Sequence, residues 1–359
     1  MARITLDHIR HAYGIRPSAP KDYALREVHH EWEDGGAYAL LGPSGCGKTT
    51  LLNIISGLVT PSEGRILFDG RDVTRASTEA RNIAQVFQFP VVYDTMTVYD
   101  NLAFPLRNRG VGEAEVKRRV EAILEMTGLA DRAHRKAQGL TADQKQKISL
   151  GRGLVRPDVS AILFDEPLTV IDPHMKWQLR SQLKRLHRQF GYTMVYVTHD
   201  QTEALTFAHK VVVMYDGEIV QIGTPAELFE KPKHTFVGYF IGSPGMNVLP
   251  MRLEGSEAVI GEGAAIRLEG IDAQRAGKAG KLEFGIRPEF VRIGREGYPL
   301  QVTKVEDLGR QKIVRGAFAG QPITAIVAED GEVPADARLT FDPAGINIYA
   351  DSWLIEQQA

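Results

Sequence analysis

One short stretch, Gly42 to Thr49 (Gly-Pro-Ser-Gly-Cys-Gly-Lys-Thr), restricts the possible folds more than any other part of the chain. It matches the spacing G-x-x-x-x-G-K-[ST], follows the apolar run Ala37 to Leu41 and precedes the helical stretch Leu51 to Ile55. A phosphate-binding loop needs this strand–loop–helix context, because glycines let backbone N–H groups turn around phosphate oxygens at a helix N-terminus. A mere glycine-rich turn would need neither the lysine nor the hydroxyl. The sequence therefore predicts a phosphate site here.

An acidic pair, Asp165 and Glu166, follows a second apolar run, Ala161 to Phe164. The carboxyl ends of neighbouring parallel strands meet at one edge of a sheet, where they reach the metal side of a bound nucleotide. We expect Thr49 and Asp165 to hold Mg²⁺, with Asp165 acting through water, and Glu166 to orient or deprotonate the attacking water. Such a pair is often only a turn, and the phosphate-binding loop gives this one its meaning.

Gln88 and His199 are two further candidates at the same edge. His199 follows the strand-like run Met194 to Thr198, and Gln88 follows the run Ile83 to Phe87. A histidine there could donate a hydrogen bond to the terminal phosphate, and a glutamine could reach Mg²⁺ or the attacking water. Taken alone, each residue is more often structural. Their position beside the predicted phosphate site makes them candidates.

The order of apolar runs predicts an α/β domain followed by an all-β domain. From Arg3 to about Pro232, strand-like and helical stretches alternate, which favours a mainly parallel sheet. After Pro244, short apolar runs are separated by Gly, Pro and Asp, which favours a small barrel or sandwich. A chain of 359 residues is also long for one core. We place the domains at 1–240 and 241–359.

Composition bounds the partners and the compartment. The 43 basic and 45 acidic residues give a formal net charge of −2, so nothing in the balance calls for nucleic acid. Cys46 is the only cysteine, which excludes an intramolecular disulfide and fits a reducing compartment. The N-terminal stretch lacks an apolar signal-peptide core, and no window approaches eighteen apolar residues. We expect a cytoplasmic chain that does not cross a membrane.

Taken in order, the loop Gly42 to Thr49, Gln88, Asp165, Glu166 and His199 resemble the nucleotide-binding subunits of ABC transporters. The likeness extends over almost the whole chain. It implies a P-loop ABC-type nucleotide-binding domain with a helical subdomain, ATP and Mg²⁺ as cofactors, and transport-coupled ATP hydrolysis. It also implies transmembrane permease subunits as partners, a second ATPase subunit, an indirect link to a solute-binding protein, and a place on the cytoplasmic face of the inner membrane.

Within that family the chain is similar to the carbohydrate importers, the subfamily that handles maltose and glycerol phosphate. Val86 to Gln88, Met96 to Asn101 and Pro105 resemble its Q-loop and its membrane-coupling segment. Phe240 to Val248 and Gly285 to Glu289 resemble the entry and core of its regulatory C-terminal domain. The resemblance therefore implies that the all-β domain is an OB-like, TOBE-like barrel.

The resemblance also extends the list of ATP-binding residues. Tyr13 corresponds to the aromatic residue that stacks on adenine, with Tyr23 as a rival. Motion is expected to pass to the membrane subunits through residues near Phe89 to Phe104. The implied ATP-binding residues are Tyr13, Gly42, Pro43, Ser44, Gly45, Cys46, Gly47, Lys48, Thr49 and Thr50.

Two departures from the family pattern stand out. Where the family has Leu-Ser-Gly-Gly-Gln, this chain has Leu140, Thr141, Ala142, Asp143 and Gln144. The Thr and Gln three residues apart predict a capping box, so the helix start is kept without the glycines. In the family that helix faces the γ-phosphate of ATP on the opposite subunit of a dimer, where a carboxylate is unfavourable unless a cation or proton intervenes. The second departure is Val170, where the dimer-contacting loop of the family has asparagine.

These departures suggest that the subunit pairs with a non-identical ATPase that carries an intact signature. One composite site would use this chain's phosphate loop, and the weaker one would use Thr141 to Gln144 of this chain. Such departures resemble paired-ATPase polyol importers, so glycerol is the leading cargo. Two alternatives stay open: a homodimeric glycerol-3-phosphate or sugar importer ATPase, and a regulatory ATP-binding subunit without turnover.

Overall fold

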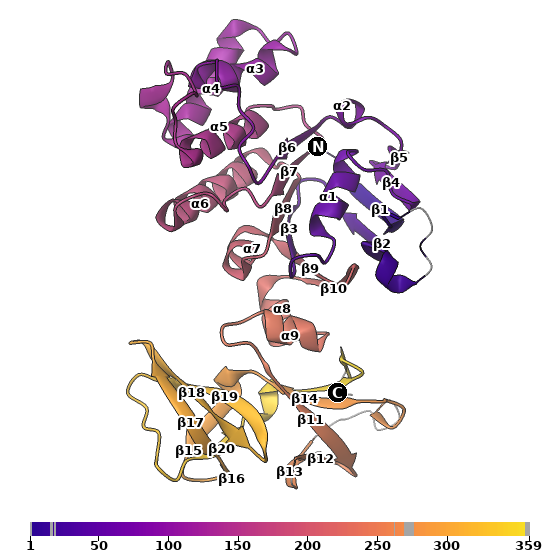
Figure 1. The fold of residues 1–359 in the computed structure, drawn as a ribbon, viewed down its shortest axis with the longest axis vertical. Coiled ribbons are helices and arrows are strands. Elements are labelled where there is room, and N and C mark those ends of the chain that lie inside the picture. The colour runs from indigo at the N-terminus through magenta and orange to yellow at the C-terminus, as the bar shows by residue number, and fades with distance from the viewer. Residues whose placement is uncertain (1, 15–16, 18, 262, 269–275, 356–359) are drawn as a thin grey trace. The chain divides into compact units, whose positions relative to one another are not determined.

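The computed structural model describes residues 2–14, 17, 19–261, 263–268 and 276–355 and forms two compact units, 1–224 and 225–359 (Figure 1). The division falls before α8 (Pro225–Glu230) and α9 (Thr235–Phe240), earlier than the predicted boundary at 240. The reason is Arg287, which is buried and donates hydrogen bonds to the carbonyls of Phe229 and Ile241. Burial lowers the pKa of Arg287 to about 10. These bonds tie the segment 225–241 to the second unit.

A single mixed sheet forms the centre of the first unit. β6, β7, β8, β3 and β9 run parallel, and β10 adds to β9 antiparallel, while β1, β2, β4 and β5 form an antiparallel wing that the strand-like runs did not predict. The strand order is β5 (Arg71–Asp72), β4 (Glu63–Phe68), β1 (Ile4–His11), β2 (Leu25–Trp32), β10 (Glu218–Gly223), β9 (Lys210–Tyr215), β3 (Ala37–Leu41), β8 (Met194–Thr198), β7 (Ala161–Asp165) and β6 (Ile83–Val86).

The central strands are apolar throughout rather than alternating. All five residues of β3 and of β8 are buried, as are the first four of β7. Parallel strands read this way because helices cover both faces of the sheet. α1 (Lys48–Ser56) buries Leu51, Leu52 and Ile54 in the same core as the antiparallel wing. The predicted strands at these positions are confirmed, and so is the helix that follows the phosphate loop.

Apart from α1 and the short α2, the helices of the first unit fall into two groups (Figure 1). α3, α4 and α5 pack on one another as a helical subdomain beyond the β6 edge, and α6 packs against α7 beside β7 and β8. α4 buries Val116, Val120 and Ile123 at helical spacing, so one face of this helix is apolar and packs inward. The bounds are α2 (Thr78–Arg81), α3 (Val98–Arg107), α4 (Glu113–Thr127), α5 (Ala142–Leu154), α6 (Pro173–Phe190) and α7 (Gln201–Phe207).

The second unit is built from antiparallel sheets around one apolar core, as the sequence predicted. Its sheets have the orders β13-β12-β11-β14-β21-β22, β15-β20-β16 and β17-β18-β19, and Phe284, Phe318 and Leu339 are fully buried between them. The bounds are β11 (Asn247–Glu254), β12 (Glu257–Ile260), β13 (Ala264–Arg267), β14 (Leu282–Ile286), β15 (Val291–Gly294), β16 (Tyr298–Pro299), β17 (Gln301–Asp307), β18 (Gln311–Phe318), β19 (Gln321–Ala328), β20 (Arg338–Phe341), β21 (Ile346–Ala350) and β22 (Trp353–Leu354). Among the described residues, every helix is too short or too polar to cross a membrane.

Candidate nucleotide site

The loop between β3 and α1 has a shape that glycine alone permits. A Cβ atom at Gly42 would lie 2.3 Å from the carbonyl oxygen of Met214, and one at Gly47 would lie 2.6 Å from that of Ala24. Gly47 also has φ = +100°, and α1 begins at the next residue. A residue with a side chain would be strained there. The loop therefore presents the N-terminal end of α1, where backbone N–H groups favour an anion.

Lys48 provides the charge of this loop. Its Nζ donates hydrogen bonds to the carbonyls of Gly42 and Pro43, each at 2.8 Å, so the ammonium lies over the turn that the glycines form. The side chain is buried. An ammonium has three donors, and the two loop carbonyls use two of them. This geometry fits a lysine that can transfer its bonds to phosphate oxygens.

Thr49 and Asp165 meet as the sequence predicted for a magnesium pair. The Thr49 hydroxyl donates a hydrogen bond to Asp165 Oδ1 at 3.2 Å. Burial raises the pKa of Asp165, and the charge of Glu166 adds to the rise, while the Thr49 bond opposes it. Hydroxyl and carboxylate oxygens are the ligands that Mg²⁺ prefers. A cation at this half-buried carboxylate would stabilise the charged form that desolvation disfavours, so the pair fits Mg²⁺ chemically.

Glu166 lies between the other two predicted residues. His199 Nδ1 is 3.1 Å from Glu166 Oε1, and Gln88 Nε2 donates a hydrogen bond to Glu166 Oε2 at 3.4 Å. The backbone of Glu166 has φ = +45°, and its N–H bonds to the carbonyl of Val197. Residues held in the left-handed region mark positions where the surroundings fix the side chain direction. The structure therefore brings together Gln88, Glu166 and His199, which are far apart in the sequence, with Gln88 beside Glu166.

Tyr13 lies beside the phosphate loop. Its hydroxyl is 3.0 Å from Thr50 Oγ1 in α1, and 68% of the residue is exposed. The rival Tyr23 is already engaged, because the Arg10 guanidinium lies 4.6 Å from its ring centroid and its hydroxyl bonds to Glu63. The geometry therefore favours Tyr13 over Tyr23 as the ring available to a base.

The signature segment, Thr141 to Gln144, forms the capped start of α5. Thr141 Oγ1 accepts from the N–H of Gln144, and the Gln144 side chain accepts from the N–H of Thr141, so the predicted capping box is confirmed. Ala142 opens the helix and is exposed. Asp143 Oδ2 pairs with Lys147 Nζ at 3.1 Å, and Lys147 is buried. The carboxylate at the signature position therefore carries its own counter-cation.

Two groups of side chains that the sequence analysis missed, each centred on a buried residue, hold the loops of Gln88, Glu166 and His199 in place. Gln146 Nε2 donates to the carbonyls of Phe87 and Pro167, both at 2.9 Å, and so ties the loop of Gln88 to the loop of Glu166. The signal for this role was a glutamine among the positions of α5 that are buried. The second group centres on the buried carboxylate of Glu203, which supports the end of β8 before His199. Its hydrogen-bond and ion-pair partners are Tyr196, Thr198, Lys176 and Arg180.

Replacing Gln146 with leucine is expected to loosen both loops. The change leaves the carbonyls of Phe87 and Pro167 without their donor, which costs about 1–3 kcal/mol of unfolding free energy. We expect kcat to fall more than the affinity for ATP, since the loops position Gln88 and Glu166 rather than the phosphate loop. Denaturant unfolding and steady-state ATPase assays measure the two effects. Gln138→Leu, at an exposed position, is the control; equal effects of the two variants would contradict this role.

Cys46 is expected to react slowly, although it lies within the phosphate loop. Only 4% of the residue is exposed, and burial raises the pKa of the thiol against the opposing effect of Lys48. Because the thiolate is the reactive form, alkylation by a maleimide should be at least about tenfold slower in the native protein than in urea at pH 7. The native rate should rise steadily towards pH 9. Mass spectrometry of the modified chain gives the rate, and equal native and unfolded rates would refute the prediction.

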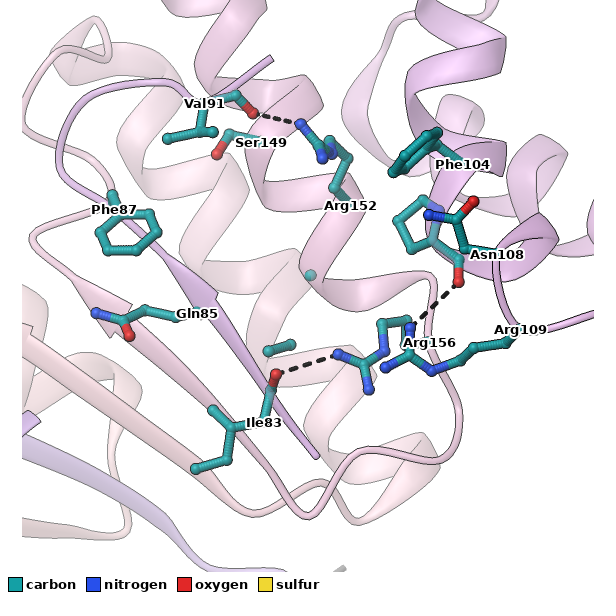
Figure 2. Close-up of a pocket in the computed structure, with 13 residues that line it drawn as sticks. Ile83, Gln85, Phe87, Val91, Phe104, Asn108, Arg109, Ser149, Arg152 and Arg156 are labelled. Atoms are coloured by element: carbon teal, nitrogen blue, oxygen red, sulfur yellow. Dashed lines mark hydrogen bonds between the residues drawn. The ribbon is translucent and has the colours of Figure 1, made fainter. Parts of the chain in front are cut away.

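A groove lined by both apolar and polar side chains lies between the sheet edge at β6 and the helical subdomain, and Phe87, the residue before Gln88, is part of its lining (Figure 2). It has a volume of about 310 Å³. Arg152 donates to the Val91 carbonyl at 2.8 Å and lies over the ring of Tyr93, which fixes one wall. Phe89, 70% exposed, lies close to it in the chain. The groove is lined by Ile83, Ala84, Gln85, Phe87, Val91, Phe104, Pro105, Asn108, Arg109, Ser149, Arg152, Gly153 and Arg156.

The phosphate loop lies beside Thr49 and Asp165, which could ligate one Mg²⁺, and Glu166 is held by hydrogen bonds nearby. This arrangement is typical of a P-loop nucleoside triphosphatase. Comparisons with known proteins narrow this class. The pattern of the ABC transporter family matches residues 25–169, and that of the MalK OB fold domain matches residues 242–291. The chain belongs to the ATP-binding subunits of ABC transporters, in the branch of the carbohydrate importers, and it is an ATP hydrolase.

Named relatives and solved structures support this assignment. The sn-glycerol-3-phosphate import ATP-binding protein of Bordetella avium is 40% identical over 81% of each chain, and that of Chromobacterium violaceum is 37% identical over 94% of this chain and 91% of its own. The ATP-binding cassette MJ0796, solved as a dimer with ADP and Pi, matches with a TM-score of 0.54 at 28% identity over 62% of this chain and 98% of its own. CbiO1 of Clostridium perfringens, from an ABC transporter complex, matches at 0.57 and 26%, over 64% and 90%. The OB fold match agrees with the predicted all-β C-terminal domain.

Proposed function

We propose that this chain drives the import of a carbohydrate or polyol, with glycerol as its leading cargo, as one half of an asymmetric pair of ATPases. It acts at the cytoplasmic face of the membrane, where it binds permease subunits without crossing the bilayer. An extracytoplasmic solute-binding protein delivers the cargo to those subunits. The observation that carries the transport role is the groove that Phe87 lines, because the chain leads from it directly to Gln88, which contacts Glu166.

The groove has the features of a docking surface for a membrane subunit. Exposed aromatic and aliphatic side chains are typical of the core of an interface. Val91 lines the groove and is exposed, as are Phe89 and Tyr93 on either side of it in the chain. The loop that bears them leads directly from Gln88, which contacts Glu166. A partner that moves this loop therefore moves the amide beside the catalytic carboxylate. Closure of the subunit pair and hydrolysis would be transmitted along this path.

Phe89→Asp is expected to abolish copurification of the chain with its permease subunits, because a carboxylate in an apolar interface is desolvated without a partner. Leu308→Asp is the control, since Leu308 is a similarly exposed apolar residue in the C-terminal unit. Retention of the permease subunits by the Phe89 variant would refute docking at this groove. Pull-down from co-expressing cells measures the outcome.

The residues support hydrolysis by in-line attack of water on the γ-phosphate. Lys48 and the N-terminal end of α1 bind phosphate oxygens, and Mg²⁺, held by Thr49 and Asp165, would neutralise the charge that develops on them. Glu166 accepts the hydrogen bond of the attacking water and orients it, with Gln88 and His199 fixing the carboxylate. His199 can also reach the terminal phosphate. Most of the catalysis is therefore positioning and charge neutralisation.

The names of related proteins bear on which solute is transported. The Bordetella avium and Chromobacterium violaceum proteins are named for import of sn-glycerol-3-phosphate. Glycerol and its phosphate share the polyol backbone, and a homodimeric glycerol-3-phosphate importer is the alternative. Uptake assays with labelled glycerol and labelled glycerol-3-phosphate, in cells with and without this gene, separate the two. Loss of glycerol-3-phosphate uptake alone would favour the alternative.

Asp143 supports the asymmetric pair. At the N-terminal end of α5 it stands where an ATP γ-phosphate of the opposite subunit would approach, and like charges about 4 Å apart cost about 1–4 kcal/mol near a protein surface. The Lys147 ammonium, 3.1 Å from Asp143, offsets part of this charge. The signature would therefore be weak rather than inert. A partner with intact glycines would complete the strong site.

Restoring the glycines tests the pairing. In the purified chain alone, Ala142→Gly combined with Asp143→Gly is expected to raise the ATPase rate at least about fivefold, since removal of about 1–4 kcal/mol of repulsion corresponds to such a factor or more. Asp143→Asn should give part of the rise, because it removes the charge and keeps the shape. A wild-type chain that already hydrolyses ATP as fast as the double variant would refute the asymmetric pair.

A further inference from the structure

A β-bulge in the antiparallel wing gathers metal-ligating side chains on one face. In the pairing of β1 with β2, Leu6 lies opposite His30 and Ile9 opposite Val28, so Asp7 and His8 together face the single residue His29. Regular alternation would point Asp7 and His8 to opposite faces of the strand. A bulge changes this, because two residues share one partner and the side chains are re-aimed. The stacked rings of His8 and His29, with centroids 4.4 Å apart, show the result.

The bulge is built into the backbone of the wing. His8 has φ = +52°, in the left-handed region that costs a residue with a side chain about 1–2 kcal/mol. On the neighbouring strand β4, Gly64 has φ = +86°, and a Cβ atom there would lie 2.2 Å from the carbonyl oxygen of His8. Glycine at this position therefore lets β4 approach the displaced backbone. Strain that the surroundings maintain in this way points to a function.

We propose that Asp7, His8 and His29 bind a late first-row divalent cation, with Zn²⁺ as the type case. Each residue offers one ligand atom, and the three atoms lie within 4.8 Å of one another. Two imidazoles and a carboxylate form a ligand set that suits Zn²⁺, Ni²⁺ and Cu²⁺ and that leaves room for water as a further ligand. A contraction of the three side chains by rotation would bring the ligand atoms to bonding distance of one ion.

Neighbouring side chains already orient these ligands. Glu27 Oε1 lies 2.7 Å from His8 Nδ1, the arrangement by which carboxylates fix metal-binding imidazoles. Arg65 Nη2 donates a hydrogen bond to Asp7 Oδ2 at 2.7 Å, and Asp7 Oδ1 faces His29 Nδ1 at 3.7 Å. One oxygen of Asp7 is thus held by Arg65 while the other points at the ring of His29. The competing interpretation is two histidine–carboxylate pairs on an exposed sheet, and a binding measurement separates the two.

Titration of the full-length chain with Zn²⁺ alone, without nucleotide or Mg²⁺, tests the site. Isothermal calorimetry should give one more saturable equivalent for the wild type than for the double variant His8→Gln/His29→Gln. Glu27→Gln should retain that equivalent with affinity lower by roughly 10- to 100-fold, as expected for a residue that orients a ligand. His174→Gln, which removes an exposed histidine at the start of α6, should bind like the wild type.

A second readout guards against misfolding and against binding elsewhere. Co²⁺ bound by two imidazoles and a carboxylate absorbs visible light, and the band should be present in the wild type and in His174→Gln and absent from His8→Gln/His29→Gln. Circular dichroism of the double variant in metal-free buffer should match the wild type. Equal stoichiometry and affinity in the wild type and the double variant would overturn the proposal, and so would a wild-type titration without a saturable difference.

Discussion

Replacing Glu166 with glutamine is expected to lower ATP turnover roughly 10²- to 10⁴-fold, which is the usual contribution of a positioned acid–base residue. Nucleotide binding should remain nearly intact, because Glu166 bonds to Gln88 and pairs with His199 rather than with the phosphate loop. The amide keeps the size of the carboxylate but cannot take a proton from water. Steady-state ATPase rates and binding of a fluorescent ATP analogue measure the two quantities.

The control for this variant is Glu121→Gln, which removes an exposed carboxylate from α4. It should leave both turnover and binding at wild-type values. If Glu166→Gln lost binding and turnover to the same extent, the change would have disturbed the fold of the site, and the assigned role would fail. A Glu166→Gln chain with wild-type turnover would transfer the role of water activation to another residue, with His199 the next to replace.

Lys48→Ala is expected to weaken ATP binding by roughly 2–5 kcal/mol, the usual result of truncating one partner of a buried charge-assisted contact. At 1.4 kcal/mol for each factor of ten, the Kd for ATP should rise about 30-fold or more. The physical reason is that the buried ammonium lies at 2.8 Å from two loop carbonyls, over the turn that receives the phosphates. Equilibrium binding of the ATP analogue is the measurement.

Two controls belong with Lys48→Ala. Lys210→Ala removes an exposed lysine whose recorded ion pair is with Glu33 at 3.3 Å, and its Kd for ATP should not change. Thermal unfolding of Lys48→Ala without nucleotide distinguishes two causes of weak binding. An unchanged Tm indicates that only the phosphate contact is lost, and a lower Tm indicates that the loop has collapsed. A Lys48→Ala chain that binds ATP with wild-type affinity would show that the backbone N–H groups of α1 suffice for binding.

Much of the nucleotide site could be predicted from local sequence. β3, β7 and β8 lie within one residue of the stretches that apolar runs indicated, and α1 begins three residues before the predicted helical stretch Leu51 to Ile55. Asp165 with Glu166 and His199 each follow a buried strand, and parallel strands deliver their ends to one edge. The capping box at Thr141 could be predicted for the same reason, since it needs only two residues three apart.

The remaining features depend on residues that are distant in the sequence. Gln146 bonds to the loops at Phe87 and Pro167 only because the helical subdomain folds back on the sheet. The division of the units before α8 depends on Arg287, which is remote in sequence from the segment it holds. In the antiparallel wing, β1 and β2 intersperse buried residues with exposed ones, so neither strand forms a continuous apolar run. Each of these contacts is set by topology, which local periodicity does not contain.

The sequence by itself determined the phosphate loop, because glycine sterics and a strand–helix junction act within a few residues. It also determined the central strands and the loss of glycines from the signature. The tertiary structure alone decided that Glu166 lies between Gln88 and His199, that Lys147 pairs with Asp143, and that a bulge brings His8 beside His29. The physical reason is that these short-range forces act between side chains whose approach only the packed fold fixes.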